Sequence, residues 1–511
     1  MSRFLSRSRQ PNHDVQLDGS YSDEEAGPVD NAKRERKFVR KLDAILVTWA
    51  FFAYLAQASS TTCPPNAIPL PQLKLNNNEL NFLDIYYRIG YAVFLLPCQV
   101  ILTKVKPNWW LPSNEMAWGL MTALMAAAKS VKMMYALRFF IGVFEASSYP
   151  GIISVLCNWY TPREVAARIV IFSASYPASA MFVSAMQASL TKTLDGSSGL
   201  AGWRWLFIFN AIMTFIVAAA GYLMVPDAPG TTKIFWMSEE DNQIALRRMQ
   251  RAERLPSTNY SWHFVKKIFK NPITYVFVLS YATWSWSQDS NGWFVLFLKA
   301  VKKADGTKRF NVAEINAISI PAYALMLLAM LLFAYVHAKT GWHTVWIVAQ
   351  ETTLLIGVII LTIWPPAFAT KMVAFFLLFC SNAVGPILIG WMSEHFRTPE
   401  ERGIVIGLAV TFVFPMSAWM SIVFYPAKHA PIYPIGYKAP IGFSLACIAL
   451  TLLFRWLSIR DHRNKVVQSE DESMSGEEYG VGQEEKAMDV DSKSATAGLP
   501  ELGNVEASKR S

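Results

Sequence analysis

Residues 138–172 read RFFIGVFEASSYPGIISVLCNWYTPREVAARIVIF. Two apolar runs flank a short polar stretch at residues 158–164, and both continue beyond the quoted segment, over residues 133–157 and 167–190. A helix needs roughly 20 mostly apolar residues to cross the hydrocarbon core of a bilayer. This stretch therefore predicts two membrane-spanning helices joined by a short polar turn.

The same pattern recurs along the 511-residue chain, of which 53% is hydrophobic and only 17% charged. This balance is typical of membrane proteins and excludes an ordinary soluble domain. The expected spans are residues 42–62, 82–103, 110–128, 133–157, 167–190 and 204–225, then 272–298, 315–337, 343–363, 368–392, 403–425 and 440–459. We predict an all-α membrane protein with twelve transmembrane helices in two six-helix halves.

The chain then divides into five parts. They are a cytoplasmic tail (1–41), a first six-helix half (42–225), a cytoplasmic central loop (226–271), a second half (272–459) and a cytoplasmic tail (460–511). In the central loop, Ser238 and Asp241 stand three positions apart ahead of several arginines, which predicts a capped surface helix. Residues 466–511 are polar and almost free of aromatics, so we expect them to be disordered.

Basic residues set the expected orientation. They gather before the first span (Lys33, Arg34, Arg36, Lys37, Arg40, Lys41) and in the central loop (Arg247, Arg248, Arg251, Arg254, Lys266, Lys267, Lys270). Lys and Arg concentrate in cytoplasmic loops, so both termini are expected in the cytoplasm of a multi-pass protein. The loop at residues 299–309 is basic too and is an exception to this bias. The plasma membrane is our first expectation, with the endoplasmic reticulum or vacuole as alternatives.

Two ionisable residues fall inside the fourth span. Arg138 and Glu145 are seven positions apart, or two helical turns, and so share one face. Charge inside a bilayer costs about 2.5 to 3.5 kcal/mol per residue on insertion scales, which makes such residues functional candidates. Arg138 can offer its planar fork to a substrate carboxylate, and Glu145 can carry a proton. The alternative is a charge pair that only fixes helix packing.

Polar residues in other spans are weaker candidates. Gln288, Asp289 and Asn291 interrupt an apolar run flanked by tryptophans in the seventh span and are predicted to line a cavity. Asp84 and Arg88 stand four apart, so a local pair on one helix is favoured over a functional role. For Glu351 in the ninth span we favour a packing role, and Gly403 with Gly407 forms a G-x-x-x-G pair that favours close helix packing.

A weak internal repeat links the two halves. Thr161-Pro162 follows the fourth span and Thr398-Pro399 follows the tenth, at an offset of 237 residues, almost half the chain. Parallel repeats of this kind are typical of transporters. Under the same offset Asn382 is the counterpart of Glu145, so we predict that it faces the same cavity.

Several kinds of chemistry have no sequence basis. The chain carries no H-E-x-x-H, P-loop, G-x-S-x-G or kinase motif, so we expect neither an enzyme nor a cofactor. Its five cysteines are widely spaced, so we expect no disulfide framework and no metal site. The net charge of +9 is spread over loops, so no nucleic-acid partner is expected. Transport driven by ion gradients fits best.

The quoted stretch, together with GLAGWRWLFIFNAIMT at residues 199–214, resembles the major facilitator superfamily. Within it, the chain is most similar to the anion:cation symporter group and its fungal allantoate permease family. The resemblance covers roughly residues 38–460. Two departures stand out: Leu55-Ala56-Gln57 replaces an acidic-basic motif late in the first span, and the glycine-rich loop after the second span is reduced to LTKVKPNWW.

The resemblance implies a proton symporter for a small organic anion, because the group includes transporters of pantothenate, biotin, nicotinate, allantoate and sulfonates. It also implies that Arg138 binds the substrate anion and that Glu145 couples the proton. We therefore expect uptake of a carboxylated vitamin such as pantothenate or biotin, with allantoate, nicotinate or sulfonates as alternatives. A non-transporting membrane sensor is the alternative from another class. The expected partners are the substrate, protons and the lipid bilayer, around a monomer.

Overall fold

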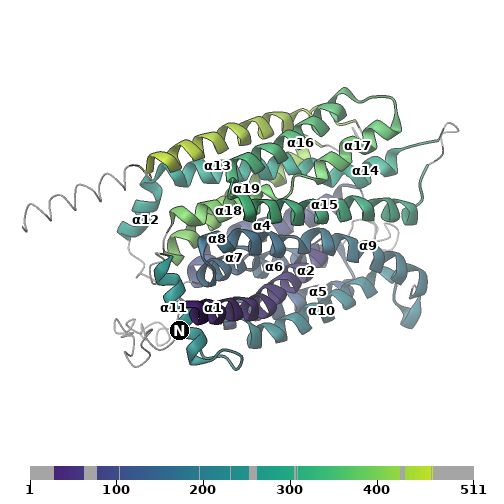
Figure 1. Ribbon diagram of the computed structural model, residues 1–511. Helices are drawn as coiled ribbons and strands as arrows, with labels where there is room; N and C mark the ends of the chain where they lie inside the picture. Colours follow the sequence, from purple (N-terminus) through teal and green to yellow (C-terminus); the bar gives the residue numbers. More distant parts are fainter. Residues whose placement is uncertain are drawn as a thin grey trace, which may run out of the picture.

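The computed structural model describes residues 28–61, 77–102, 104–194, 196–230, 232–252, 262–303, 307, 309–396, 398–425, 432–461 and 463. These residues form long helices that run side by side in one bundle (Figure 1). The tail predicted to be disordered, residues 466–511, lies outside the described residues.

The helices of the first half of the chain are α1 (Pro28–Leu42), the π-helical turn η1 (Asp43–Val47), α2 (Thr48–Thr61), α4 (Asn77–Leu102), α5 (Pro107–Ala126), α6 (Val131–Glu145), α7 (Ser148–Trp159), α8 (Pro162–Ser173), α9 (Ser175–Thr193) and α10 (Gly202–Met224). Two connecting helices follow, α11 (Glu239–Arg251) and α12 (Trp262–Lys270). The second half consists of α13 (Pro272–Gln288), η3 (Asp289–Trp293), α14 (Phe294–Ala300), α15 (Val312–Thr340), α16 (His343–Ile363), α17 (Phe368–Phe379), α18 (Val384–His395), α19 (Pro399–Val423) and a last helix, Ala439–Asp461.

Within the described residues, nine helical segments are long and apolar enough to cross a membrane. Three more segments, α5, α13 with η3 and α14, and α19, pack against them. Each of the twelve predicted spans thus coincides with a helical segment of the bundle. Large apolar side chains cover the outside, as Ile216 (66% exposed) and Leu328 (65%) show. Such a surface suits lipid better than water.

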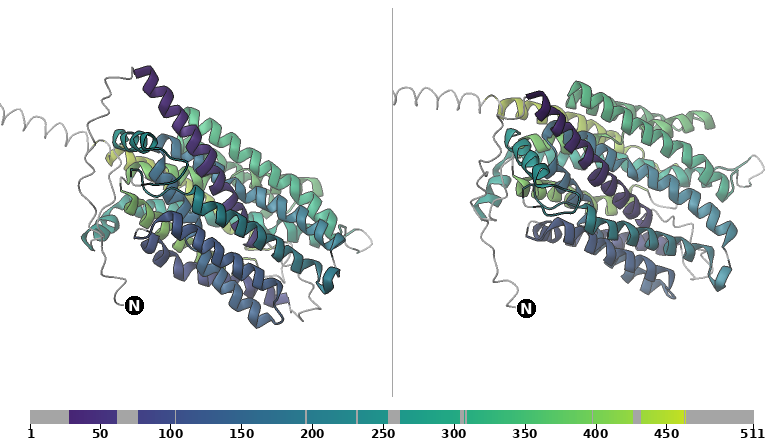
Figure 2. Two further views of the ribbon diagram at one scale, coloured as in Figure 1. Left: turned by 90° about the horizontal axis from the view of Figure 1, so that it is seen from below. Right: turned by 60° about the horizontal axis from the view of Figure 1, so that its bottom comes forward.

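The two halves lie on opposite sides of the bundle. In Figure 1 the green and yellow helices of the second half lie above the purple and blue helices of the first, and in Figure 2, seen from below, the helices of the first half lie in front. Within the first half, α5 packs on α10 and α4 on α6; within the second, α16 packs on α17 and α13 on α19. Between the halves, α4 and α7 contact α19, α8 contacts α18, and α9 contacts α15.

Three of the predicted spans are broken near their middle. The breaks fall at residues 146–147 between α6 and α7, at residue 174 between α8 and α9, and at residues 380–383 between α17 and α18. In each case a proline stands three positions after the last residue of the break, namely Pro150, Pro177 and Pro386. Proline lacks a backbone donor and its ring clashes with the carbonyl four residues earlier, which interrupts the helix there. Sequence reasoning had predicted these spans as continuous helices.

The repeated Thr-Pro pairs begin equivalent helices. Thr161 caps α8 and Thr398 caps α19; in each case proline follows at the first helical position and a glutamate, Glu164 or Glu401, completes a capping box. Such boxes satisfy backbone donors that the first turn of a helix leaves open. The short sequence match is therefore one helix-start signal used in both halves.

We name the end of the bundle at which α1, α11 and α12 lie the proximal end, and the opposite end the distal end (Figure 1). The capped helix predicted in the central loop is α11, with the Ser238 and Asp241 capping box present. It packs on α1 through ion pairs. The buried guanidinium of Arg248 contacts Glu35 of α1 at 2.9 Å and Glu164 of α8 at 2.5 Å.

Candidate functional site

Glu145 ends helix α6 in the interior of the bundle. Its side chain is fully buried. The Ser60 hydroxyl, at the end of α2, donates a hydrogen bond to Oε1 at 2.5 Å, and the Tyr87 hydroxyl of α4 donates to Oε2 at 2.9 Å. Both carboxylate oxygens are thus satisfied by helices other than their own. A buried carboxyl with two hydroxyl donors can hold a proton or a negative charge without a large rearrangement.

Arg138 lies two turns before Glu145 on the same helix and is 7% exposed. Its Nη1 donates to the Ser60 carbonyl at 3.4 Å, and its Nε has no hydrogen-bond partner among the described residues. Among those residues Arg138 forms no ion pair with Glu145; Ser60 lies between the two, its carbonyl toward the arginine and its hydroxyl toward the glutamate. A buried guanidinium with an open N–H donor has the chemistry to pair with an anion.

Gln57 also belongs to this group. It is 4% exposed and lies within hydrogen-bonding reach of Glu145 and of Tyr91. Sequence reasoning identified Gln57 only as part of a departure from a family motif, Leu55-Ala56-Gln57. The structure places this neutral amide beside the carboxyl group of Glu145, where it adds another hydrogen-bonding group.

Aromatic side chains line the surroundings of the site. Tyr54 packs against Tyr149 and Phe172, with ring centroids 5.2 and 4.8 Å away. Tyr149 of the first half lies close to Tyr281 of the second, so that the two side chains interact across the halves. These tyrosines were not among the sequence candidates. Their only sequence signal is their position in spans that also carry polar residues.

In the second half, the polar residues of α13 and η3 meet the break between α17 and α18. The Gln288 amide donates to the Ser381 carbonyl at 2.9 Å and to its hydroxyl at 2.8 Å, and Asn291 donates to Gln288 at 2.8 Å. Asn382 lies in the same break, and its amide donates to the Phe379 carbonyl at 3.4 Å. Among the described residues, no hydrogen bond joins this group to Arg138 or Glu145.

Glu145 and Asn382 nonetheless occupy equivalent places. Glu145 stands at the α6–α7 break and Asn382 in the α17–α18 break, as the repeat offset predicts. Each side chain is positioned because a proline four or five residues later stops the helix. The repeat therefore relates two breaks in the helices, one beside the acid Glu145 and one that contains the neutral amide Asn382.

Asp289 has different neighbours from Gln288. It lies near Arg88 of α4, so that the two charges interact across the halves. Arg88 also forms the local ion pair with Asp84 that the sequence predicts, at 2.7 Å. Sequence reasoning interpreted Asp84 and Arg88 as a local pair. In the structure, Arg88 also lies near Asp289 of the second half.

Two remaining candidates have packing contacts. Glu351 is fully buried, and its Oε2 accepts a hydrogen bond at 2.6 Å from Ser444 of the last helix. Gly407 faces Gln99 and Leu96 of α4, where an added Cβ would lie 3.3 Å from the Gln99 side chain. Both features join neighbouring helices, as the sequence reading favoured.

Comparisons with known proteins agree with this architecture. A family model described as Major Facilitator Superfamily matches residues 50–421. MFS transporter PfmaC of Pestalotiopsis fici is 29% identical over 85% of this chain and 83% of its own length. Pantothenate transporter liz1 of Schizosaccharomyces pombe is 26% identical over 85% and 84%, and the vitamin H transporter of Saccharomyces cerevisiae is 25% identical over 80% and 70%.

Among solved structures, the proton:xylose symporter XylE has a TM-score of 0.64 and 13% sequence identity, covering 83% of this chain and 96% of XylE. The organic anion transporter MFSD10 from human has a TM-score of 0.57 at 11% identity, covering 80% and 98%. Identities this low show a shared fold.

Proposed function

The chain belongs to the major facilitator superfamily and is a membrane transporter, and we propose that it couples uptake of a small organic anion to protons. The observation that carries this proposal is the arrangement at Ser60. A buried acid and a buried arginine share one serine, so a change of charge on one alters the surroundings of the other.

The proposed cycle begins with protonation of Glu145 from outside. The neutral carboxylic acid no longer attracts the Arg138 guanidinium, whose open Nε and remaining N–H groups then bind the substrate carboxylate. Release of the proton on the inside restores the negative charge of Glu145. That charge competes with the substrate for Arg138 and favours release.

The energetics of this cycle are simple. One proton carried with one monoanion moves no net charge, so a difference of two pH units, about 2.7 kcal/mol, supports about 100-fold accumulation. A second proton would add the membrane potential, about 2.3 kcal/mol per 100 mV. The neutral Gln57 beside Glu145 favours a single proton site in the first half.

For the substrate we propose a carboxylated vitamin, pantothenate or biotin first. The names of two relatives support this choice, and a carboxylate suits Arg138 while the tyrosine-rich surroundings suit an apolar chain. Allantoate, nicotinate and sulfonates share the anionic group and remain alternatives. Gln288, Asp289, Asn291 and Asn382 are proposed to contact the remainder of the substrate from the second half.

We further propose the plasma membrane as the site of action, with both termini in the cytoplasm, and a monomer as the working unit. The proximal end would then face the cytoplasm. The basic residues of α1, α11 and α12 at that end support this orientation.

The deciding experiment is uptake of labelled pantothenate, biotin, nicotinate, allantoate and a sulfonate at external pH 5 and pH 7.5. For one anion we expect faster accumulation at pH 5. Arg138→Ala should lower uptake at least about tenfold, since loss of a hydrogen bond to a charged group costs about 1.5 to 3 kcal/mol. Glu145→Gln should abolish accumulation against a gradient and remove the pH dependence.

Glu351→Gln is the matched control. It changes another fully buried acid, whose hydrogen bond from Ser444 an amide oxygen can still accept, and should leave uptake and its pH dependence nearly unchanged. Uptake that is indifferent to pH and to both test variants would overturn the proposal. If none of the anions moves, a non-transporting sensor becomes the better reading.

A further inference from the structure

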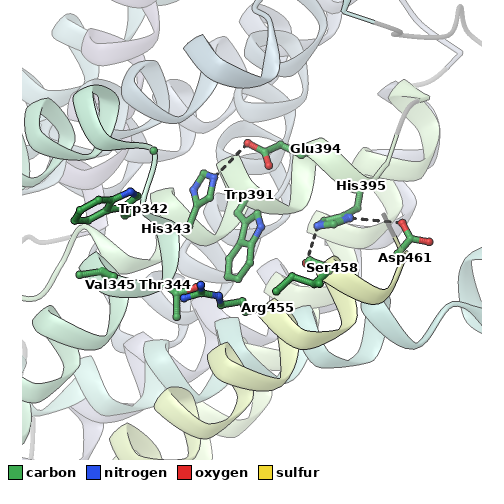
Figure 3. Close-up of a pocket in the computed structure, with 12 residues that line it drawn as sticks. Trp342, His343, Thr344, Val345, Trp391, Glu394, His395, Arg455, Ser458 and Asp461 are labelled. Atoms are coloured by element: carbon green, nitrogen blue, oxygen red, sulfur yellow. Dashed lines mark hydrogen bonds and ion pairs between the residues drawn. The ribbon is translucent and has the colours of Figure 1, made fainter. Parts of the chain in front are cut away.

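A cavity of about 700 Å³ opens at the proximal end of the second half (Figure 3). Its lining comes from the beginning of α16, the end of α18 and the end of the last helix, with Trp391 near its centre (Figure 3). Among the residues that the structure describes, none that lines the cavity belongs to the first half. The cavity therefore lies outside the interface between the halves and apart from the proposed substrate site.

Two carboxylates lie beside histidines at the rim of the cavity. Glu394 lies 3.3 Å from Nε2 of His343, whose ring stacks on Trp391 with centroids 5.3 Å apart. Asp461 lies 4.0 Å from Nδ1 of His395. Both carboxylate side chains keep 35% of their surface exposed, so they remain accessible.

Arg455 brings the opposite charge into the same cavity. It is exposed, and among the described residues it has no acidic partner. In Figure 3 its guanidinium lies near Thr344, on the opposite side of Trp391 from Glu394. The cavity thus combines an accessible cation with two accessible anions, which suits a ligand that carries both charges.

The cavity lies where the membrane meets water. Its lining falls at the ends of the candidate membrane spans His343–Ile363, Phe368–His395 and Ala439–Asp461. Arg455 stands six residues before Asp461, about 9 Å along the helix axis. Trp342 and Trp456 are 62% and 56% exposed there, and tryptophan is enriched at membrane interfaces. Val345 and Ile459 add exposed apolar surface at the rim.

We propose that this cavity binds the headgroup of an aminophospholipid from the proximal leaflet. The phosphate would pair with Arg455, the primary ammonium would donate hydrogen bonds to Glu394 and Asp461, and the acyl chains would leave along Val345 and Ile459. A choline headgroup has no N–H to donate, so these carboxylates would discriminate against it. An anionic headgroup without an amine would meet the two carboxylates unfavourably.

The test uses the full-length chain in nanodiscs of phosphatidylcholine with equal small fractions of phosphatidylethanolamine and phosphatidylglycerol, followed by native mass spectrometry of retained lipid. Phosphatidylethanolamine should be retained preferentially. Arg455→Gln should lower this retention about tenfold, equivalent to about 1.4 kcal/mol. Glu394→Gln should remove the preference for phosphatidylethanolamine over phosphatidylcholine.

Arg460→Gln is the matched control because Arg460 is an exposed arginine of the same helix that contacts Trp456 outside the cavity. Equal losses in the Arg455 and Arg460 variants would show general attraction of lipid phosphates and overturn the proposal. Equal retention of all three lipids would also overturn the proposal. Displacement of the lipid by millimolar inorganic phosphate would assign the cavity to a free anion instead.

Discussion

Ser60 joins the two buried charges of the first half. Its hydroxyl contacts Glu145 and its carbonyl contacts Arg138, so one residue at the end of α2 faces both. Helical periodicity places Arg138 and Glu145 on the same face, but it contains no information about which neighbouring helix contributes the group between them. At the scale of single residues, this serine is the first test of the proposed coupling.

We predict that Ser60→Ala retains uptake but shifts its pH dependence. The substitution removes a hydroxyl that stabilises the ionised carboxylate of Glu145 and leaves the carbonyl that holds Arg138. The protonated form of the acid is then favoured, and half-maximal uptake should move to a higher external pH by about one unit. A pH series of initial uptake rates measures the shift.

Ser59→Ala serves as the control for that change. The Ser59 hydroxyl contacts the Leu55 carbonyl and the Ser179 hydroxyl instead of Glu145. Its removal should leave the pH profile in place. Identical profiles for wild type and Ser60→Ala would mean that the hydrogen bond to Glu145 does not influence the proton-binding step.

Helix α11 illustrates how local signals and packing combine at the scale of elements. Its sequence predicts a capped helix, and the structure shows that its cap residue Asp241 also contacts α1, where Lys41 lies 2.6 Å away. Burial raises the pKa of Asp241, but the hydrogen bonds from Lys41 and Ser238 outweigh this effect and lower it below the ordinary value of 3.8. The Asp241 carboxylate therefore caps α11 and also holds it against α1.

The sign of this shift predicts a pH dependence. Because the folded form lowers the pKa of Asp241, its contribution to the docking of α11 is complete above pH of about 4 and is lost as the pH falls further. At pH 7, Asp241→Asn should increase amide hydrogen exchange in α11 several-fold, because docking no longer includes the charged pair. Hydrogen exchange with peptide-level mass spectrometry measures this.

Glu240→Gln provides the comparison for α11. Glu240 pairs with Arg34 at 3.0 Å, but both side chains are at least half exposed, and exposed pairs contribute little. Exchange in α11 should stay close to that of the wild type. If the Asp241 and Glu240 variants behave alike, the Lys41 contact does not dock the helix.

On the scale of the whole molecule, the two halves are held together at the proximal end. Arg402, in the first turn of α19, is 1% exposed and donates to Asn158 Oδ1 at 2.7 Å and to the Cys157 carbonyl at 3.4 Å, both in α7 of the first half. Nearby, Gly390 of α18 approaches Ala166 of α8 so closely that an added Cβ would lie 2.5 Å from the Ala166 Cβ. Under the proposed orientation, release of substrate at this end would require these contacts to open.

We therefore predict that Arg402→Gln increases access to the proximal end. In a chain whose other cysteines are replaced by alanine, the fully buried Cys157 should react several-fold faster with a membrane-permeant maleimide. Arg204→Gln is the control, since Arg204 contacts the carbonyls of Ala126 and Ala128 within the first half. An unchanged rate in the Arg402 variant would show that this contact does not keep the halves closed.

Much of the fold follows from local sequence. The spans were predictable because a run of apolar residues long enough to cross a bilayer has few alternatives to a helix, and the relation of Glu145 to Asn382 followed from a repeated Thr-Pro signal. A proline follows each break in the spans, but Pro97, Pro321 and Pro415 lie inside continuous helices, so the prolines alone did not locate the breaks. The charge of Arg138 and Glu145 alone identified them as candidates.

The partners of these candidates depend on tertiary structure. Ser60, Tyr87 and Gln57 reach Glu145 from α2 and α4, and Arg88 faces Asp289 across the two halves. Apolar length and helical periodicity act within one segment, so the sequence by itself determined the helices, their repeat and the charged face of the fourth span. Which faces of separate helices meet depends on how their side chains fit together, and only the packed bundle decided that.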